Sequence, residues 1–134
     1  MNTKRILIFE DEWNTIKGSF ELANIFAFDE GLEFTQKAKS QDVSFDNLRT
    51  NYDAIFVDIT LAKNTQLDGY HIIKKISDDN LFDLPKMVVM TGNNKVEEKL
   101  KDVGLNPKKL RIVYKPIDFE ELSSVLKSVL GENV

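Results

Sequence analysis

Short apolar runs alternate along this chain with longer segments in which apolar residues recur every three or four positions. Five runs have the length of a strand and cover residues 5–9, 32–35, 54–59, 87–90 and 111–114. The first is continuously apolar after its arginine, and the third is apolar except for one acid near its end. Such runs are typical of strands that are covered on both faces of a sheet.

The longer segments have the period of amphipathic helices. They cover about residues 13–27, 70–76, 96–103 and 119–130, with a shorter helix expected within 42–51. Gly104 suits the left-handed end of the third helix, and Asp118 suits the cap of the last, with Glu121 three residues later. Strands that alternate with helices predict a parallel sheet with helices on both faces, here a (βα)5 unit.

In an open parallel sheet, a ligand site lies beyond the carboxyl ends of the strands. The residues expected there are Glu10, Asp11 and Glu12 after the first run, Asp58 in the third, Thr91 and Gly92 after the fourth, and Lys115 and Pro116 after the fifth. The pattern therefore predicts that carboxylates, a hydroxyl and a lysine converge at one edge of the sheet.

Asp58 is the member of this set that is hardest to explain by structure alone. It follows four apolar residues, and a buried carboxylate costs several kcal/mol unless a partner compensates it. The next helix begins only near Gly69, so Asp58 is not in a capping position. Glu10, Asp11 and Glu12 have a simpler alternative, because acids also stabilise the first turn of a helix.

The amino-acid composition limits which metal sites and which binding partners the chain can have. The 134 residues include no cysteine and one histidine, His71, which excludes thiolate and multi-histidine metal sites and leaves oxygen ligands for Mg2+ or Ca2+. A net charge of −4 gives no chain-wide basic surface for nucleic acid or anionic membranes. With no signal-peptide stretch at the start and no run of about 18 apolar residues, we expect a cytoplasmic protein.

The converging residues suit phosphoryl transfer. Glu10, Asp11 and Asp58 offer oxygen ligands to Mg2+, which keeps positions free for water and phosphate oxygens. A carboxylate is also a nucleophile toward phosphorus. Lys115 and Thr91 would then meet the charge on the phosphoryl oxygens, with Asp58 as the acceptor.

At this point the sequence resembles the receiver domain of two-component response regulators over essentially its whole length. The residues that carry the resemblance are 6–12, 55–59, 90–92 and 114–118. It implies a doubly wound, flavodoxin-like domain over 1–134, with a core of about 4–130, strand order 2-1-3-4-5 and no output domain. It also implies a stand-alone protein of the chemotaxis-regulator type, monomeric or weakly dimeric, whose apolar positions belong to the core.

The resemblance further implies roles for single residues. Asp58 would accept a phosphoryl group from a sensor histidine kinase or phosphotransfer protein, and Thr91, Gly92 and Lys115 would contact that group. The metal ligands would be Glu10, Asp11, Asp58 and the backbone carbonyl of Thr60, with Mg2+ bound and Mn2+ or Ca2+ as substitutes in a crystal. Thr60 and Asn93 would tune a slow self-catalysed dephosphorylation, Lys115-Pro116 would be a cis bond, and the output would be a contact with a downstream protein.

Three departures from the family pattern stand out. Glu10 replaces an aspartate, which leaves open whether it binds metal directly or through water. The segment 60–67 is about three residues longer than usual and lacks a proline, which bears on kinase docking and dephosphorylation. Thr91 is often coupled to an aromatic residue three positions before the lysine, but Ile112 stands there, with Tyr114 next to Lys115.

Other classes of protein are less consistent with the sequence. A flavodoxin-like cofactor binder needs glycines or hydroxyls after the first strand, and an aspartate-nucleophile phosphatase usually has a second acid at the position of Thr60. The remaining alternative is a pseudo-receiver that binds proteins without being phosphorylated. Asp58, Thr91 and Lys115 occurring together favour the phosphoacceptor.

Overall fold

The five apolar runs form one parallel sheet in the computed structural model, which describes residues 3–131. Its strands are β1 (Lys4–Phe9), β2 (Leu32–Lys37), β3 (Ala54–Asp58), β4 (Met87–Thr91) and β5 (Arg111–Tyr114). They lie in the order β2-β1-β3-β4-β5. This confirms the predicted doubly wound fold and its strand order.

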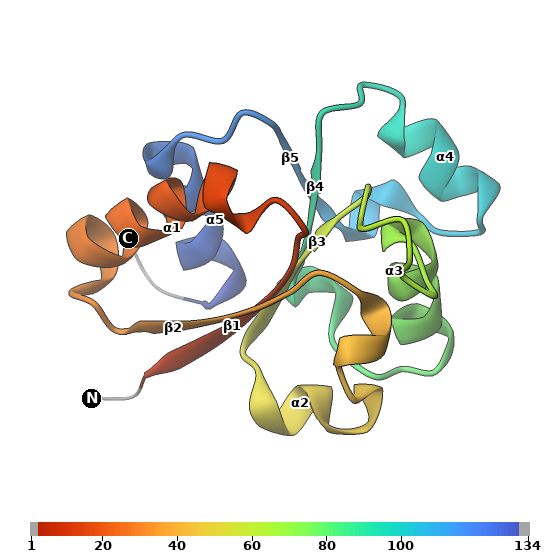
Figure 1. Cartoon of the computed structure of the whole chain (residues 1–134), viewed down its shortest axis with the longest axis horizontal. Helices are drawn as coiled ribbons and strands as arrows, with labels where there is room; N and C mark the ends of the chain where they lie inside the picture. Colours follow the sequence, from red (N-terminus) through yellow and green to blue (C-terminus); the bar gives the residue numbers. More distant parts are fainter. Residues whose placement is uncertain (1–2, 132–134) are drawn as a thin grey trace.

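Helices cover both faces of the sheet, as Figure 1 shows. On one face lie α1 (Trp13–Phe28) and α5 (Phe119–Val129); on the other lie α3 (Gly69–Asp78) and α4 (Val96–Asp102). The short helix expected within 42–51 is a 3-10 turn, Phe45–Asn47, followed by α2 (Leu48–Asn51). Further 3-10 turns are η1 (Ser40–Asp42), η3 (Leu84–Lys86) and η4 (Pro107–Lys109).

Alternate residues of the central strands supply two hydrophobic cores. In β1, Ile6 and Ile8 pack toward α1 and α5, whereas Leu7 and Phe9 pack toward α3 and α4. All four are fully buried. The continuous apolar runs in the sequence thus reflect a sheet that is covered on both sides.

The helix ends follow the predicted chemistry. The Asp118 carboxylate accepts a hydrogen bond of 2.7 Å from the backbone N–H of Glu121, and Asp68 caps α3 in the same way through His71. Gly104 follows α4 with a φ of 86°, a conformation that a residue with a side chain adopts only with strain.

Gly69 is required for another reason, because it packs directly on the backbone of β3. A Cβ atom at this position would lie 2.4 Å from the carbonyl oxygen of Asp58. The start of α3 therefore lies against the end of the strand that carries Asp58, and the segment 60–68 leaves and returns at nearly the same point.

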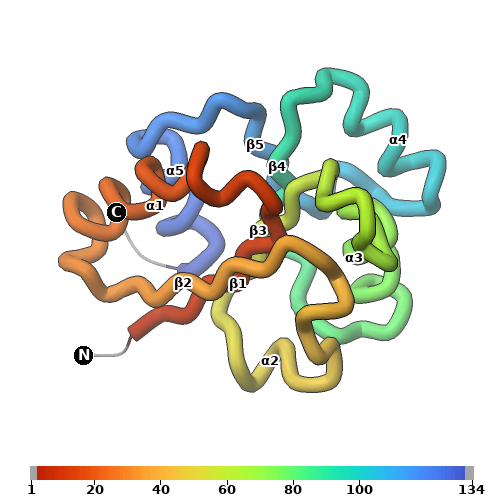
Figure 2. The backbone as a smooth tube through the Cα atoms, viewed as in Figure 1, coloured from red at the N-terminus to blue at the C-terminus, as the bar shows by residue number. Residues whose placement is uncertain are grey.

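The carboxyl ends of the strands lie together, and Figure 2 follows the chain out of β1, β3, β4 and β5 there. The opposite end of the molecule carries α2 and the turns between helices and strands. The predicted site residues are thus gathered at one edge.

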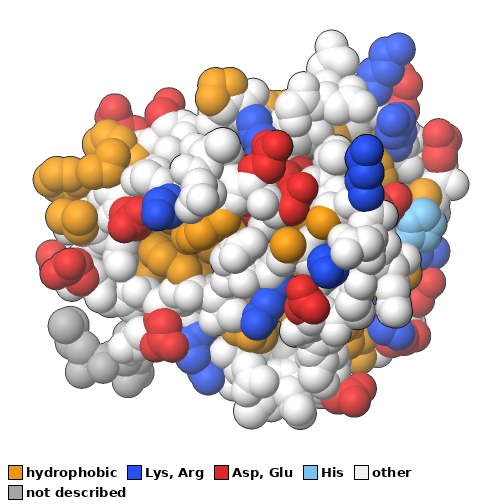
Figure 3. All heavy atoms as spheres, in the orientation of Figure 1, with side chains coloured by type: hydrophobic (Ala, Val, Ile, Leu, Met, Phe, Trp, Pro, Cys, Tyr) orange, Lys and Arg blue, Asp and Glu red, His pale blue; other side chains and the backbone are white. Residues whose placement is uncertain are grey.

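The expectation that the apolar positions belong to the core is wrong for part of α1. Leu22, Ile25 and Phe26 are 41%, 49% and 71% exposed. Figure 3 shows hydrophobic side chains gathered where α1 lies in Figure 1. The second half of α1 therefore has apolar residues on both its buried and its exposed side. Within residues 3–131, no helix combines the length and the apolar character needed to cross a membrane.

Candidate functional site

Lys115 lies between two carboxylates at the carboxyl edge of the sheet. Its ammonium Nζ donates to Oε1 of Glu10 at 2.5 Å and to Oδ2 of Asp58 at 2.8 Å. Glu10 is fully buried, and the Asp58 side chain is 8% exposed. Residues at or just after the ends of β1, β3 and β5, separated by up to 105 positions, are thereby joined in one polar cluster.

The parallel strands bring these residues together. In the sheet register, Asp58 pairs with Met90 of β4, and the next residue of β4, Thr91, pairs with Tyr114 of β5. The N–H of Lys115 donates to the carbonyl of Thr91 at 2.8 Å, so the residue after β5 is fixed beside the end of β4. The peptide bond Lys115-Pro116 is cis, as the resemblance implied.

Burial changes the acidity of Glu10. Desolvation of its carboxyl group, together with the hydrogen bond and charge of Asp58, raises the pKa of Glu10 to about 8, although Lys115 acts in the opposite direction. Burial alone would lower the pKa of Lys115, but its hydrogen bonds with Asp58 and Glu10 outweigh this and raise it. Lys115 therefore stays a cation, and Glu10 takes up a proton more readily than an ordinary glutamate.

The Asp58 carboxylate is held at both oxygens. Oδ1 accepts the backbone N–H of Thr60 at 3.0 Å, while Oδ2 accepts Lys115. A buried carboxylate with two fixed donors keeps one orientation, which answers the sequence-based question of what compensates its charge.

The predicted metal ligands also lie close together. One carboxylate oxygen from each of Glu10, Asp11 and Asp58 lies within 4.8 Å of the others. Two oxygens bound to one Mg2+ ion lie at most about 4.2 Å apart, twice the usual Mg–O distance of about 2.1 Å. The three carboxylate oxygens thus lie close to the spacing that one Mg2+ ion needs, and oxygen is the ligand atom that this ion prefers, so the donor set fits Mg2+. Asp11 is exposed and open to solvent.

The alternative of helix capping receives no support at the start of α1. Glu12 occupies the N-cap position, but its side chain makes no capping hydrogen bond. Its backbone N–H instead donates to Oε2 of Glu10 at 3.3 Å.

Thr91 and its neighbours lie at the end of β4, the strand next to the one that ends in Asp58. The Thr91 side chain is buried, and its hydroxyl oxygen accepts the N–H of Asn93 at 2.9 Å. Gly92 is exposed, and a Cβ atom there would meet no other atom within 4 Å. Asn93 and Thr60 are exposed and face the same cavity.

Ile112, at the position where the family often has the aromatic residue coupled to the threonine, and Tyr114 lie in different surroundings on β5. Ile112 is half-buried against the core beneath α3 and α4. Tyr114 is 44% exposed at the strand end. The aromatic ring nearest to Lys115 in sequence is therefore a surface group in this structure.

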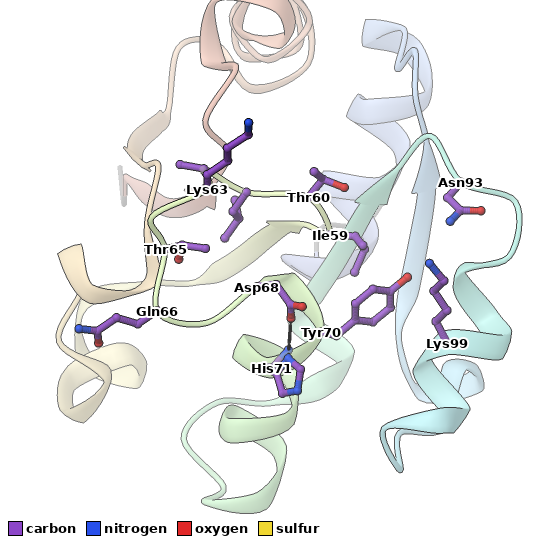
Figure 4. Close-up of a pocket in the computed structure, with 12 residues that line it drawn as sticks. Ile59, Thr60, Lys63, Thr65, Gln66, Asp68, Tyr70, His71, Asn93 and Lys99 are labelled. Atoms are coloured by element: carbon purple, nitrogen blue, oxygen red, sulfur yellow. Dashed lines mark hydrogen bonds and ion pairs between the residues drawn. The ribbon is translucent and has the colours of Figure 1, made fainter.

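A cavity of about 600 Å³ lies beside the segment 60–68, and Ile59 and Thr60, the two residues that follow Asp58, line it. Figure 4 shows this segment on one side and Tyr70, Asn93 and Lys99 on the other. The Tyr70 hydroxyl is buried and has no hydrogen-bond partner among residues 3–131, and burial together with the charge of Asp68 raises the pKa of this phenol. Sequence reasoning gave His71 no role, and its Nδ1 lies 2.8 Å from Asp68, which caps α3.

Sequence reasoning missed two residues that support the site, one at the end of β2 and one just after it. Gln36 donates to the carbonyl of Glu10, and Ser40 binds the segment 60–68 through Thr65 and Leu67. No periodicity or motif marks these residues, because their partners are 25 to 27 positions away.

Comparisons with known proteins bear on the fold. No protein-family model matches the chain, and neither does any curated protein. Solved structures do match. A protein described as a response regulator from Chloroflexus aurantiacus is 20% identical, with a TM-score of 0.73, over 98% of this chain and 100% of that one. A CheY-like receiver domain from Methanospirillum hungatei is 18% identical, with a TM-score of 0.69, over 97% and 95% of the two chains.

A third match concerns the metal. The receiver domain of a sensor histidine kinase from Pseudomonas aeruginosa is 24% identical, with a TM-score of 0.70, over 97% of this chain and 99% of that one. In that protein a magnesium ion is coordinated in the active-site cleft. TM-scores of 0.69 to 0.73 over nearly the whole chain show that it has the receiver-domain fold of response regulators. At identities of 18% to 24%, the argument about function must come from the chain's own site.

Proposed function

We propose that this protein is a phosphoacceptor receiver of a two-component system, and that Asp58 takes a phosphoryl group from a histidine kinase or phosphotransfer protein. The observation that carries the proposal is the position of Lys115, whose ammonium group bonds both Asp58 and Glu10 in a nearly buried site. A cation fixed beside a buried carboxylate nucleophile is the arrangement that transfer of an anionic group needs.

The transfer follows from the residues present. An Asp58 oxygen attacks the phosphorus of a phosphohistidine, a P–O bond forms, the P–N bond breaks, and its electron pair stays on the imidazole nitrogen. Lys115 meets the negative charge on the phosphoryl oxygens, and the Thr91 hydroxyl at the end of β4 supplies a further hydrogen bond. Thr60 N–H keeps the acceptor carboxylate oriented.

Magnesium belongs to the same proposal. Glu10, Asp11, Asp58 and the Thr60 carbonyl would hold the ion, which supplies charge neutralisation to the phosphoryl oxygens when bound. The acidic cluster and the ion in the Pseudomonas receiver domain support this assignment.

The acyl phosphate would return to the resting state by hydrolysis. Water attacks phosphorus, the bond to Asp58 breaks, and inorganic phosphate leaves. Thr60 and Asn93, which face the cavity beside Asp58, would govern how water reaches the phosphoryl group. The protein would thus catalyse its own phosphorylation and dephosphorylation and signal through contacts with a downstream protein in the cytoplasm.

Incubation with a small phosphodonor and Mg2+, followed by intact mass, tests the proposal. We expect an adduct of about 80 Da, the mass that one phosphoryl group adds, on the wild type and none on Asp58→Asn. Asp53→Asn is the matched control, because Asp53 lies at the opposite end of β3 and should leave the adduct unchanged. A wild type that forms no adduct under any donor or metal condition would be a pseudo-receiver.

A further inference from the structure

Residues 36–41, here called the strap, contact both loops that carry the proposed metal ligands. At its first end, Gln36 Nε2 donates to the carbonyl of Glu10, and the N–H of Glu10 donates to the carbonyl of Lys37 at 3.0 Å. At its second end, Ser40 and Gln41 bind the segment 60–68. A single short stretch of chain thus connects the end of β1 with the loop that follows Asp58.

The second end is a reciprocal set of hydrogen bonds. Ser40 N–H donates to Oγ1 of Thr65 at 2.9 Å, and Leu67 N–H donates to Oγ of Ser40 at 2.9 Å. Gln41 accepts the N–H of Gln66 at 2.9 Å and donates to the carbonyl of Asn64 at 2.9 Å. Ser40 is 3% exposed, so its hydroxyl has little access to competing water.

Thr65 is the central residue of this set. Its hydroxyl accepts from Ser40 N–H and donates to the carbonyl of Leu67 at 2.8 Å, which closes a tight turn within the segment. Its backbone N–H donates to the carbonyl of Ala62 at 3.0 Å. A residue without the hydroxyl could make only the last of these bonds.

The same segment continues to the proposed metal site. Two hydrogen bonds hold the two ends of the segment together with β3. Gly69 N–H donates to the carbonyl of Ile59 at 3.2 Å, and Thr60 N–H donates to the carboxylate of Asp58. Leu61 is buried in the core beneath α3 and α4. Only residues 61–64 lie between Thr60 and Thr65, so the strap contacts are a short stretch of chain away from the carbonyl of Thr60.

We propose that the strap sets the spacing between Glu10 and Thr60. In this proposal Ser40 and Thr65 act through their hydroxyl groups as positioning residues for the cation site. The inference rests on the proposed function, because it takes Glu10 and the Thr60 carbonyl as metal ligands. Neither hydroxyl touches the ion or the phosphoryl group. Both act through the backbone of the segment 60–68.

Amide hydrogen exchange without metal tests the strap by itself. Thr65→Val has nearly the same shape as threonine but lacks the hydroxyl, and we expect the Thr60 and Leu61 amides to exchange at least several-fold faster in this variant. Thr65→Ser should keep the wild-type rate, because it retains the hydroxyl. Ser123→Ala, which removes a half-buried hydroxyl bond on α5, is the matched control. Unchanged exchange at Thr60 and Leu61 in Thr65→Val would overturn the proposal.

Mg2+ titration tests the effect on the cation site. Trp13, the only tryptophan, begins α1 two residues after Asp11 and gives a fluorescence signal close to the site. We expect Thr65→Val to raise the Kd for Mg2+ by about three- to tenfold, at or below the usual range for outer-shell changes. Thr65→Ser and Ser123→Ala should match the wild type, and Ser40→Ala should weaken binding like Thr65→Val.

Phosphorylation rates separate positioning from general damage. At subsaturating Mg2+ the rate in Thr65→Val should fall with the lost affinity, and at saturating Mg2+ it should return to within about twofold of the wild type. A rate that stays low at saturating Mg2+, or a Kd equal to that of the wild type, contradicts the strap. A wild type that neither binds Mg2+ nor forms the adduct contradicts the proposed function instead.

Discussion

Three side chains determine the electrostatics of the site. Glu10 and Asp58 both accept a hydrogen bond from the ammonium group of Lys115, and burial raises the pKa of Glu10 to about 8. A glutamate in an aspartate's place reaches further, and here its Oε1 meets Lys115 directly. The residue at this position therefore takes part in a proton equilibrium close to neutral pH.

The raised pKa of Glu10 predicts a pH dependence of stability. Between the unfolded pKa near 4.5 and the folded value near 8, the folded state holds a proton that the unfolded state has released. The free energy of unfolding should therefore fall as pH rises through this window, by at most about 1.4 kcal/mol per pH unit from this group, and level off above it.

Urea denaturation in EDTA at several pH values from 5 to 9 measures this effect. Glu10→Gln lacks the titrating group, so the wild-type free energy minus that of the variant should decrease with rising pH. A difference that stays constant across the range would show that Glu10 titrates alike in the folded and unfolded states.

At the scale of elements, the helices depend on caps that the sequence makes visible. The Asp118 cap and Gly104 were predicted because capping is local in sequence, whereas the Asp68 cap of α3 was not predicted. Such contacts involve residues within four positions of each other, so their spacing is preserved in the chain itself.

Removal of the α5 cap should cost stability without changing the fold. We expect Asp118→Ala to lower the free energy of unfolding by about 1 kcal/mol, because the Glu121 N–H loses its acceptor. Asp118→Asn retains a capping oxygen and should lose less than half of that. Thermal or urea unfolding compares the two variants, and equal losses would assign the effect to charge rather than to the hydrogen bond.

Four of the strands match the predicted runs to within one residue at each end, whereas β2 continues two residues beyond its predicted end. β1 and β3 appear as apolar runs because every side chain of their buried parts meets a core. β2 lies at the sheet edge, and its last two residues, Gln36 and Lys37, are polar. Backbone pairing with β1 extends β2 beyond its apolar part, which hydrophobic pattern alone does not reveal.

The candidate site also has a part that the sequence predicts and a part that it does not. Parallel strands must end at one edge, so the meeting of Glu10, Asp58 and Lys115 could be predicted from the sequence. The supporting bonds from Ser40 to Thr65 could not, because side-chain contacts between two loops leave no period or motif. The sequence showed that the segment 60–67 is long, and the structure shows what holds it in place.

At the scale of the whole molecule, one sheet separates two cores. Phe20 is fully buried on the α1 side, with its ring centroid 5.3 Å from that of Trp13, 5.5 Å from Phe34 and 5.2 Å from Phe56. Phe26, on the same helix, is 71% exposed and contacts Phe119 at 5.8 Å. Two phenylalanines six positions apart thus have opposite surroundings.

This contrast gives a test of the packing. We expect Phe20→Ala to lower the free energy of unfolding by about 3–5 kcal/mol, the usual cost of a cavity at a buried ring. Phe26→Ala should cost less than about 1 kcal/mol, since it removes a mostly exposed ring. Urea denaturation followed by Trp13 fluorescence and by circular dichroism would measure both. A comparable loss in the two variants would contradict the packing described for α1.

The position of Lys115 also has a consequence for how the protein is used. The lysine supplies positive charge between two carboxylates, so the site has an internal counterion before any metal arrives and after it leaves. Structural zinc domains, by contrast, lose their fold with the ion. In the proposed receiver function the site would pass repeatedly between loaded and empty states, and this built-in cation would let the ion come and go while the strands around it stay in place.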